Sequence, residues 1–101
     1  MSNTQYTQRY FVSYSSVKLP LNLVNELVAA SDRENRNTFF LGIYDEQQRL
    51  IRCEKQVYGE IELLHQYQYH SNGVLSLAEI TDADGEVTVL RFDELGNAIT
   101  D

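Results

Sequence analysis

The chain has 101 residues, of which 43% are hydrophobic, and it carries a formal net charge of −7. This length fits one domain, and no run approaches the ~20 apolar residues that a membrane-spanning helix needs. The charge is uneven, because residues 1–55 sum to +1 and residues 56–101 to −8. Nucleic acid and anionic membranes are bound through clustered cations, so the acidic half argues against both as partners.

The first residues are polar and show no apolar periodicity. We therefore expect a flexible tail over residues 1–8 and a single β-rich domain over residues 9–101. The start lacks the basic and apolar regions of a secretory signal, which favours a cytoplasmic protein. Cys53 is the lone cysteine and cannot form an internal disulfide. It lies in a strand-like run, so we expect a buried structural thiol.

The amino-terminal third contains one clear strand and one ambiguous segment. Aromatic and β-branched residues over Tyr10–Tyr14 predict a strand. Leucines alternate over Leu19–Leu23 as in a strand, whereas the spacing up to Ala30 also fits a helical stripe behind Pro20. We expect an extended start that passes into a short helix near residues 24–30, followed by a surface loop over Ser31–Asn37.

From residue 38 onward, alternating segments are separated by turn residues. Asn72-Gly73 and Asp84-Gly85 predict tight hairpins, the first as a type I′ turn, whereas Tyr58-Gly59 is an imperfect pair for such a turn. The fold class is therefore mainly β, with a single antiparallel meander sheet of five or more strands. The expected strands lie near Thr38–Tyr44, Arg49–Val57, Glu60–His70, Val74–Thr81 and Glu86–Phe92, with a further short one near Ala98.

A phrase made of an aromatic residue, a turn and a strand start occurs three times, at Tyr44–Ile51, Tyr69–Leu75 and Phe92–Ile99. Such self-similarity predicts stacked hairpins. The first and third phrases resemble the YD repeats of Rhs-type proteins, and the second resembles the MORN-variant repeats of small bacterial antitoxin-like proteins. The resemblance covers about residues 38–99 and implies a shell, scaffold or protein-binding module. The chain also resembles a small uncharacterised bacterial family.

Strand parity divides the side chains of the segment 60–70 between two faces. Odd positions, from Ile61 to Tyr69, are apolar or aromatic and are expected in the core, while even positions are mostly polar. Leu64 and Tyr58 are apolar residues on the polar parity. An exposed apolar residue ringed by polar ones is typical of a modest protein interface. The predicted partner-binding residues are therefore Leu64 as the anchor, with Glu60, Glu62, Asp82, Asp84 and Glu86 around it.

The patterns that would indicate catalysis or metal binding are missing. His65 and His70 lie five residues apart on one strand and therefore on opposite faces, so we expect no metal site. The segment Asp82–Glu86 lacks the third alternate carboxylate and the distal glutamate of an EF-hand, which favours a plain turn over a calcium site. No phosphate-binding loop or nucleophile motif occurs. We expect no catalytic residue and no cofactor.

These observations favour a non-enzymatic interaction module that binds a basic protein partner through an acidic sheet face. One alternative is an acidic inhibitor or immunity-type protein that blocks a nucleic-acid-binding site. Another is a small-molecule binder or minor enzyme with a cleft formed by His65, Tyr67 and Tyr69. An edge left uncovered at Tyr10–Tyr14 or Phe39–Ile43 would favour a homodimer through the amino-terminal part of the sheet.

Overall fold

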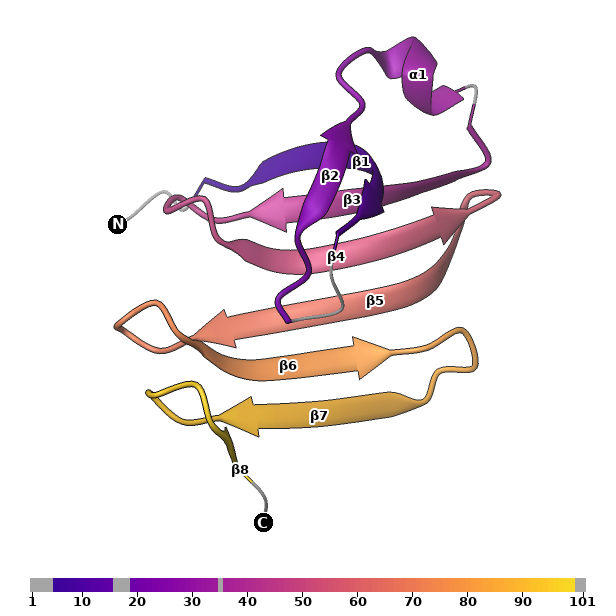
Figure 1. Ribbon diagram of the computed structural model, residues 1–101. Coiled ribbons are helices and arrows are strands. Elements are labelled where there is room, and N and C mark those ends of the chain that lie inside the picture. Colours follow the sequence, from indigo (N-terminus) through magenta and orange to yellow (C-terminus); the bar gives the residue numbers. More distant parts are fainter. Residues whose placement is uncertain (1–4, 16–18, 35, 100–101) are drawn as a thin grey trace.

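The computed structural model describes residues 5–15, 19–34 and 36–99. One antiparallel sheet contains eight strands in the order β2-β1-β3-β4-β5-β6-β7-β8, and from β3 onward it is a simple meander (Figure 1). The predicted mainly-β fold class is confirmed. The elements are β1 (Thr7–Tyr14), β2 (Leu23–Glu26), α1 (Ala30–Glu34), β3 (Thr38–Tyr44), β4 (Leu50–Val57), β5 (Glu60–Tyr69), β6 (Leu75–Thr81), β7 (Val87–Phe92) and β8 (Ala98–Ile99).

The amino-terminal part differs from the sequence prediction in two places. Thr7 and Gln8 already pair with β3, so the predicted tail over residues 1–8 is too long; residues 1–4 lie outside the described part of the chain. The predicted helix near residues 24–30 is also wrong, because Leu23–Glu26 is a strand that pairs with β1. The five-residue helix begins only at Ala30.

The physical reason lies in which side chains of the segment Leu19–Glu26 and its continuation to Val28 are buried. Leu21 and Leu23 are buried, as strand alternation requires, whereas Val28, which the helical stripe would bury, is 86% exposed. Asn25 has a φ of 62°, a left-handed conformation that an α-helix does not contain. Pairing with β1 and burial of alternate leucines therefore outweigh the local helical spacing.

This arrangement also removes the premise of the predicted homodimer. β1 lies between β2 and β3, and β3 lies between β1 and β4, so neither predicted edge is a sheet edge. Leu23 and Val24 of β2 pair with Tyr14 and Ser13, on the side of β1 away from β3. β2, where the sequence analysis predicted a helix, thus covers this edge of β1. Dimerisation through Tyr10–Tyr14 or Phe39–Ile43 has no free strand to use.

Four of the hairpin loops share one backbone pattern, which explains the repeated phrase. In each, the first and fifth residues are joined by an N–H···O bond, and the fourth residue donates to the first carbonyl, at 2.8–3.0 Å. The fourth residue has a positive φ, which glycine adopts easily. In three loops the first residue is an aspartate whose carboxylate accepts the N–H groups of the third and fifth residues. The loops are Asp45–Arg49, His70–Val74, Asp82–Glu86 and Asp93–Asn97.

The hairpin positions were predicted correctly, but the turn type was not. Gly73 and Gly85 have positive φ while Asn72 and Asp84 do not, so neither is a type I′ turn. The two-residue turn with both residues in the left-handed region is Tyr58-Gly59, with φ values of 50° and 81°. Tyr58 is held there because its N–H donates to the Asn37 carbonyl at 2.7 Å.

The strand register sorts side chains onto two faces. We call the arm the segment Leu19–Glu26, and the face it packs on the covered face. A β-carbon at position 42 would come within 2.8 Å of the Leu23 side chain, so Gly42 allows the arm to approach. The Leu21 N–H donates to the Tyr67 hydroxyl at 3.3 Å, which ties the arm to β5. The core between arm and sheet consists of Phe11, Leu21, Leu23, Phe40, Leu50, Cys53, Tyr67, Leu75 and Ala78.

The opposite side of the sheet, here called the open face, carries a continuous cross-strand row. The pairing runs from β1 to β7 in one register. The last three residues of this row, on β5, β6 and β7, are Leu64, Thr81 and Val87. In the next row on the same face, Glu79 of β6 pairs with Val89 of β7. The row is, in order, Tyr10, Leu41, Glu54, Leu64, Thr81 and Val87.

Candidate protein-binding surface

The residues predicted to bind a partner lie on two neighbouring hairpins at one end of the sheet. Figure 1 shows the β4–β5 turn and the β6–β7 loop at the same end. We call this the acidic end: residues 58–64 and 81–89. The structure brings together all six predicted residues there, since Leu64 pairs with Thr81 and Thr81 pairs with Val87.

The five carboxylates of the acidic end fall into two groups. Asp82 stabilises its own loop, because its Oδ1 accepts the N–H groups of Asp84 and Glu86 at 2.9 and 3.0 Å. Glu62 forms an ion pair with Lys55, at 3.2 Å from Nζ. The other three, Glu60, Asp84 and Glu86, are exposed, and their carboxylates have no ion pair among the described residues. They are the charges available to a partner.

Leu64, the predicted anchor, is only partly buried, and it lies between Glu54 and Thr81 on the open face. The more exposed apolar side chains are nearby and were missed by the sequence prediction. Ile61 is 48% exposed, Val87 50% and Val89 46%. We call Ile61, Leu64, Val87 and Val89 the apolar patch.

Ile61 joins this patch because of a β-bulge. The β4–β5 register shifts between Lys55 and Gln56, so that Leu63 pairs with Lys55 but Ile61 pairs with Gln56. Glu62 is the extra residue, and it reverses the alternation of β5. Gln56 contacts Glu54 of the open face through a 3.0 Å hydrogen bond. The parity prediction that placed Ile61 in the core is therefore wrong.

Behind the patch, the open face is stabilised by a polar network on β4. Glu54 is buried, and its two oxygens accept hydrogen bonds from Arg52 Nε at 2.8 Å and Gln56 Nε2 at 3.0 Å. A buried carboxylate with both oxygens satisfied is a structural group rather than a reactive one. This network lies beside Leu64 of the apolar patch, since Glu54 pairs with Leu64.

The opposite end of the sheet, here called the loop end, consists of the loops 45–49, 70–74 and 93–97. Side chains connect these loops to one another. His70 Nε2 hydrogen-bonds to the Phe92 carbonyl at 2.8 Å, and Asn72 donates to the Glu94 carbonyl at 3.0 Å. The Arg49 guanidinium lies over the Tyr69 ring at 5.0 Å. The polar groups of this end are therefore largely used within the molecule.

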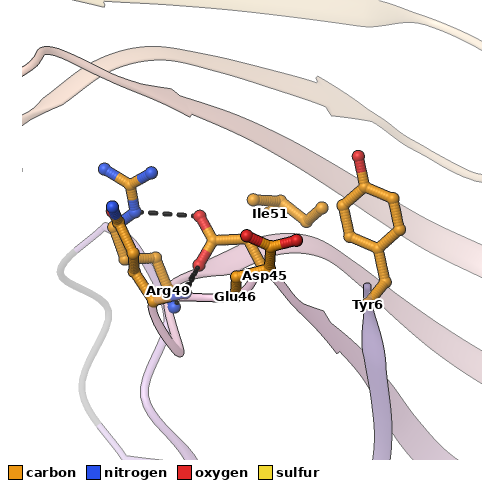
Figure 2. Close-up of a pocket in the computed structure, with 6 residues that line it drawn as sticks. Tyr6, Asp45, Glu46, Arg49 and Ile51 are labelled. Carbon is orange, nitrogen blue, oxygen red and sulfur yellow. Dashed lines mark hydrogen bonds and ion pairs between the residues drawn. The ribbon is translucent and has the colours of Figure 1, made fainter. Parts of the chain in front are cut away.

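A cavity of about 310 Å³ at the loop end is lined by charged residues, yet both of its carboxylates, Asp45 and Glu46, are hydrogen-bonded within the protein. Figure 2 shows the Asp45 carboxylate bound to the Arg49 side chain and backbone, with Tyr6 on the far side of Ile51. Burial raises the pKa of Asp45, but its hydrogen bonds from Arg49 and Gln47 outweigh this and lower the pKa overall. The carboxylate stays ionised to hold the turn, so this cavity is not a candidate site.

The residues considered for metal or thiol chemistry have structural environments. Cys53 is buried, and desolvation followed by the nearby Glu54 charge raises the pKa of its thiol to about 12. His65 is buried on the covered face, and His70 is held by Phe92 at the loop end. Among the described residues, no group of three or more His, Cys, Asp and Glu side chains could hold a metal ion. None of the described helices is long and apolar enough to cross a membrane.

The predicted aromatic and histidine cleft is only partly formed. Tyr67 is buried beneath the arm, and the Tyr69 hydroxyl donates to the Leu50 carbonyl. Neither is open to a ligand. His65 lines an opening between the arm and β5–β6.

The chain belongs to DUF6156, a family of unknown function whose model matches residues 3–101. No curated protein and no solved structure matched the chain. The family match treats nearly the whole chain as one unit and gives no evidence for YD or MORN repeats. The recurring phrase at Tyr44, Tyr69 and Phe92 coincides with the shared loop pattern, and loop chemistry is sufficient to explain it.

Proposed function

We propose that this member of the DUF6156 family is a non-enzymatic interaction module that binds a basic protein through the acidic end of its sheet. The observation that carries the proposal is the apolar patch, whose most exposed members are about half exposed and lie at the same end of the sheet as three exposed carboxylates without an ion pair among the described residues. An apolar centre with a charged rim is the usual composition of a protein interface.

The two components of the surface would act at different stages. Glu60, Asp84 and Glu86 would attract a basic partner over a Debye length, about 8 Å at physiological ionic strength. Burial of Ile61, Val87 and Val89 would then set the lifetime of the complex. The association rate should therefore depend on the salt concentration, whereas the dissociation rate should depend little on it.

A capture experiment with matched variants tests this proposal. The protein is immobilised in its native form, in the double variant Glu60→Lys with Glu86→Lys, and in the control Glu34→Lys with Glu94→Lys. The two variants change the net charge equally, but only the first changes the acidic end. We expect extract proteins of the native host to be captured by the native and control forms and lost from the first variant.

Equal capture by all three forms would show that the charges of the acidic end do not contribute to binding, and equal loss from both variants would show that net charge alone decides it. In either case the acidic end would be ordinary solvated surface. A captured nucleic-acid-binding protein that nucleic acid displaces would identify the narrower function of an inhibitor. Replacement of Val87 by Thr, which keeps shape but removes apolar surface, should speed dissociation without changing the salt dependence.

A further inference from the structure

Between the arm and the covered face lies an opening of about 280 Å³. Its walls are mainly apolar and come from both layers, the arm on one side and β5–β6 on the other. A cavity of about 150 Å³ accommodates benzene, so this opening has room for a substituted ring. The lining residues are Tyr14, Leu19, Leu21, Leu63, His65 and Ile80.

One polar group in this wall, the imidazole of His65, has a hydrogen-bond donor without a partner among the described residues. The Tyr67 hydroxyl accepts the Leu21 N–H at 3.3 Å and lies 2.6 Å from His65 Nδ1. Since the hydroxyl has one proton to donate, its bonds are satisfied when it donates to Nδ1. The imidazole proton is then on Nε2, on the other side of the ring.

The Nε2–H group has no partner among the described residues, although His65 is only 6% exposed. No buried side-chain nitrogen or oxygen in the described part of the chain lacks a partner, so Nε2 must reach open space. The opening beside Leu63 and Ile80 is the space that the ring lines. The site thus has one oriented donor in an otherwise mainly apolar wall, a composition typical of small-molecule sites.

We propose that this opening binds a small uncharged molecule with an apolar body and a carbonyl oxygen that accepts the hydrogen bond of His65 Nε2–H. The opening lies on the covered face, opposite the apolar patch, although Leu63 of its wall also belongs to the acidic end. Burial lowers the pKa of His65 and keeps the ring neutral. A neutral donor and a net charge of −7 both disfavour a carboxylate ligand.

Three ligands of nearly equal shape test the chemistry. Acetophenone has the carbonyl, α-methylstyrene replaces its oxygen by a CH₂ group, and benzoate carries a charge. Each is titrated into the native protein while backbone and imidazole NMR signals are followed. We expect acetophenone to shift the signals of lining residues and of His65 Nε2–H, and to bind about three- to tenfold more tightly than α-methylstyrene, as a neutral hydrogen bond allows.

Benzoate should bind more weakly than acetophenone. Equal affinity for acetophenone and α-methylstyrene, shifts located elsewhere, or no saturable shift at the solubility limit of acetophenone would each overturn the proposal. Ile80→Trp should fill the opening and abolish binding, whereas Gln68→Trp, at an exposed position on the open face of β5, should leave binding unchanged. If Ile80→Trp does not fold, the ligand comparison on the native protein still decides.

Discussion

The two ends of the sheet use similar hairpin chemistry for different purposes. At the loop end, His70 and Asn72 bond the 70–74 loop to the backbone of the next hairpin, and Arg49 of the 45–49 loop lies over the Tyr69 ring. At the acidic end, no described side chain hydrogen-bonds the 58–59 turn to the 82–86 loop. The loop end uses its polar groups to stabilise the fold, whereas the acidic end leaves three carboxylates and the apolar patch facing solvent. An exposed polar group is therefore a candidate for recognition only where it is not already hydrogen-bonded or paired within the fold.

The largest contrast between the ends is expected in core packing. Leu75 is the first residue of β6, after the 70–74 loop, and is buried. Val87 is the first residue of β7, after the 82–86 loop, and is 50% exposed. Leu75→Ala should lower the free energy of unfolding by about 2–5 kcal/mol. Val87→Ala should change it by less than about 0.5 kcal/mol, as surface substitutions do. Urea denaturation of both variants measures the difference, and equal losses would mean that Val87 belongs to the core.

A smaller contrast is expected between two aspartates. Asp45 accepts two backbone N–H groups and pairs with Arg49 at 2.9 Å, whereas the Asp84 carboxylate has no partner in the described part of the chain. Asp45→Ala should cost about 1–3 kcal/mol, the usual cost of leaving such donors unsatisfied. Asp84→Ala should be nearly neutral. A thermal midpoint that falls equally in both variants would contradict the assignment of Asp45 to structure and Asp84 to recognition.

Mild acid should destabilise the covered face, through His65, before it destabilises the loop end. Burial lowers the pKa of His65 below its ordinary value of 6.5, so the unfolded chain binds this proton first as the pH falls. The stability that the neutral ring contributes is complete above pH 6.5 and declines below it, with a slope of at most about 1.4 kcal/mol per pH unit.

Denaturation at pH 7 and at pH 5.5 measures this decline, and in His65→Phe it should disappear. The hydrogen bonds of Asp45 and Asp93 lower the pKa of both carboxyls, so the loop end should lose stability only below about pH 4. A decline of equal size in His65→Phe would show that another group titrates there.

The smallest expected effect is on the ionic-strength dependence of partner binding. In the native protein, raising the salt concentration should reduce the association rate and leave the dissociation rate nearly unchanged. Glu60→Lys with Glu86→Lys should flatten this dependence. Surface plasmon resonance at several salt concentrations separates the two rates. A salt effect confined to dissociation would contradict a steering role for the acidic end.

The sequence was most informative where local signals and the final fold agree. From residue 38 onward, alternation and loop residues locate every strand, because each strand pairs with its neighbour in the chain. The helix predicted near residues 24–30 failed because a helical spacing there competes with pairing to β1, which the local sequence does not show. Ile61 was misplaced because a bulge at Glu62 has no sequence signature and reverses the faces.

The candidate site was predictable in its charges but not in its apolar centre. The acids cluster in the sequence, and the meander brings their hairpins to one end. Val87 and Val89 alternate like core residues, and only the structure shows that they lie on the open face, which the arm does not cover. Tyr58-Gly59 formed the type I′ turn because Asn37, distant in sequence, holds Tyr58 in place.

The measurement that tests the central claim most directly is amide hydrogen exchange of the protein with and without its captured partner. If the acidic end is the binding surface, exchange should slow over residues 60–64 and 82–89 in the complex. The loops 45–49, 70–74 and 93–97 should be unchanged and serve as the internal control. Slowed exchange confined to those loops or to the arm, with residues 60–64 and 82–89 unaffected, would contradict the account.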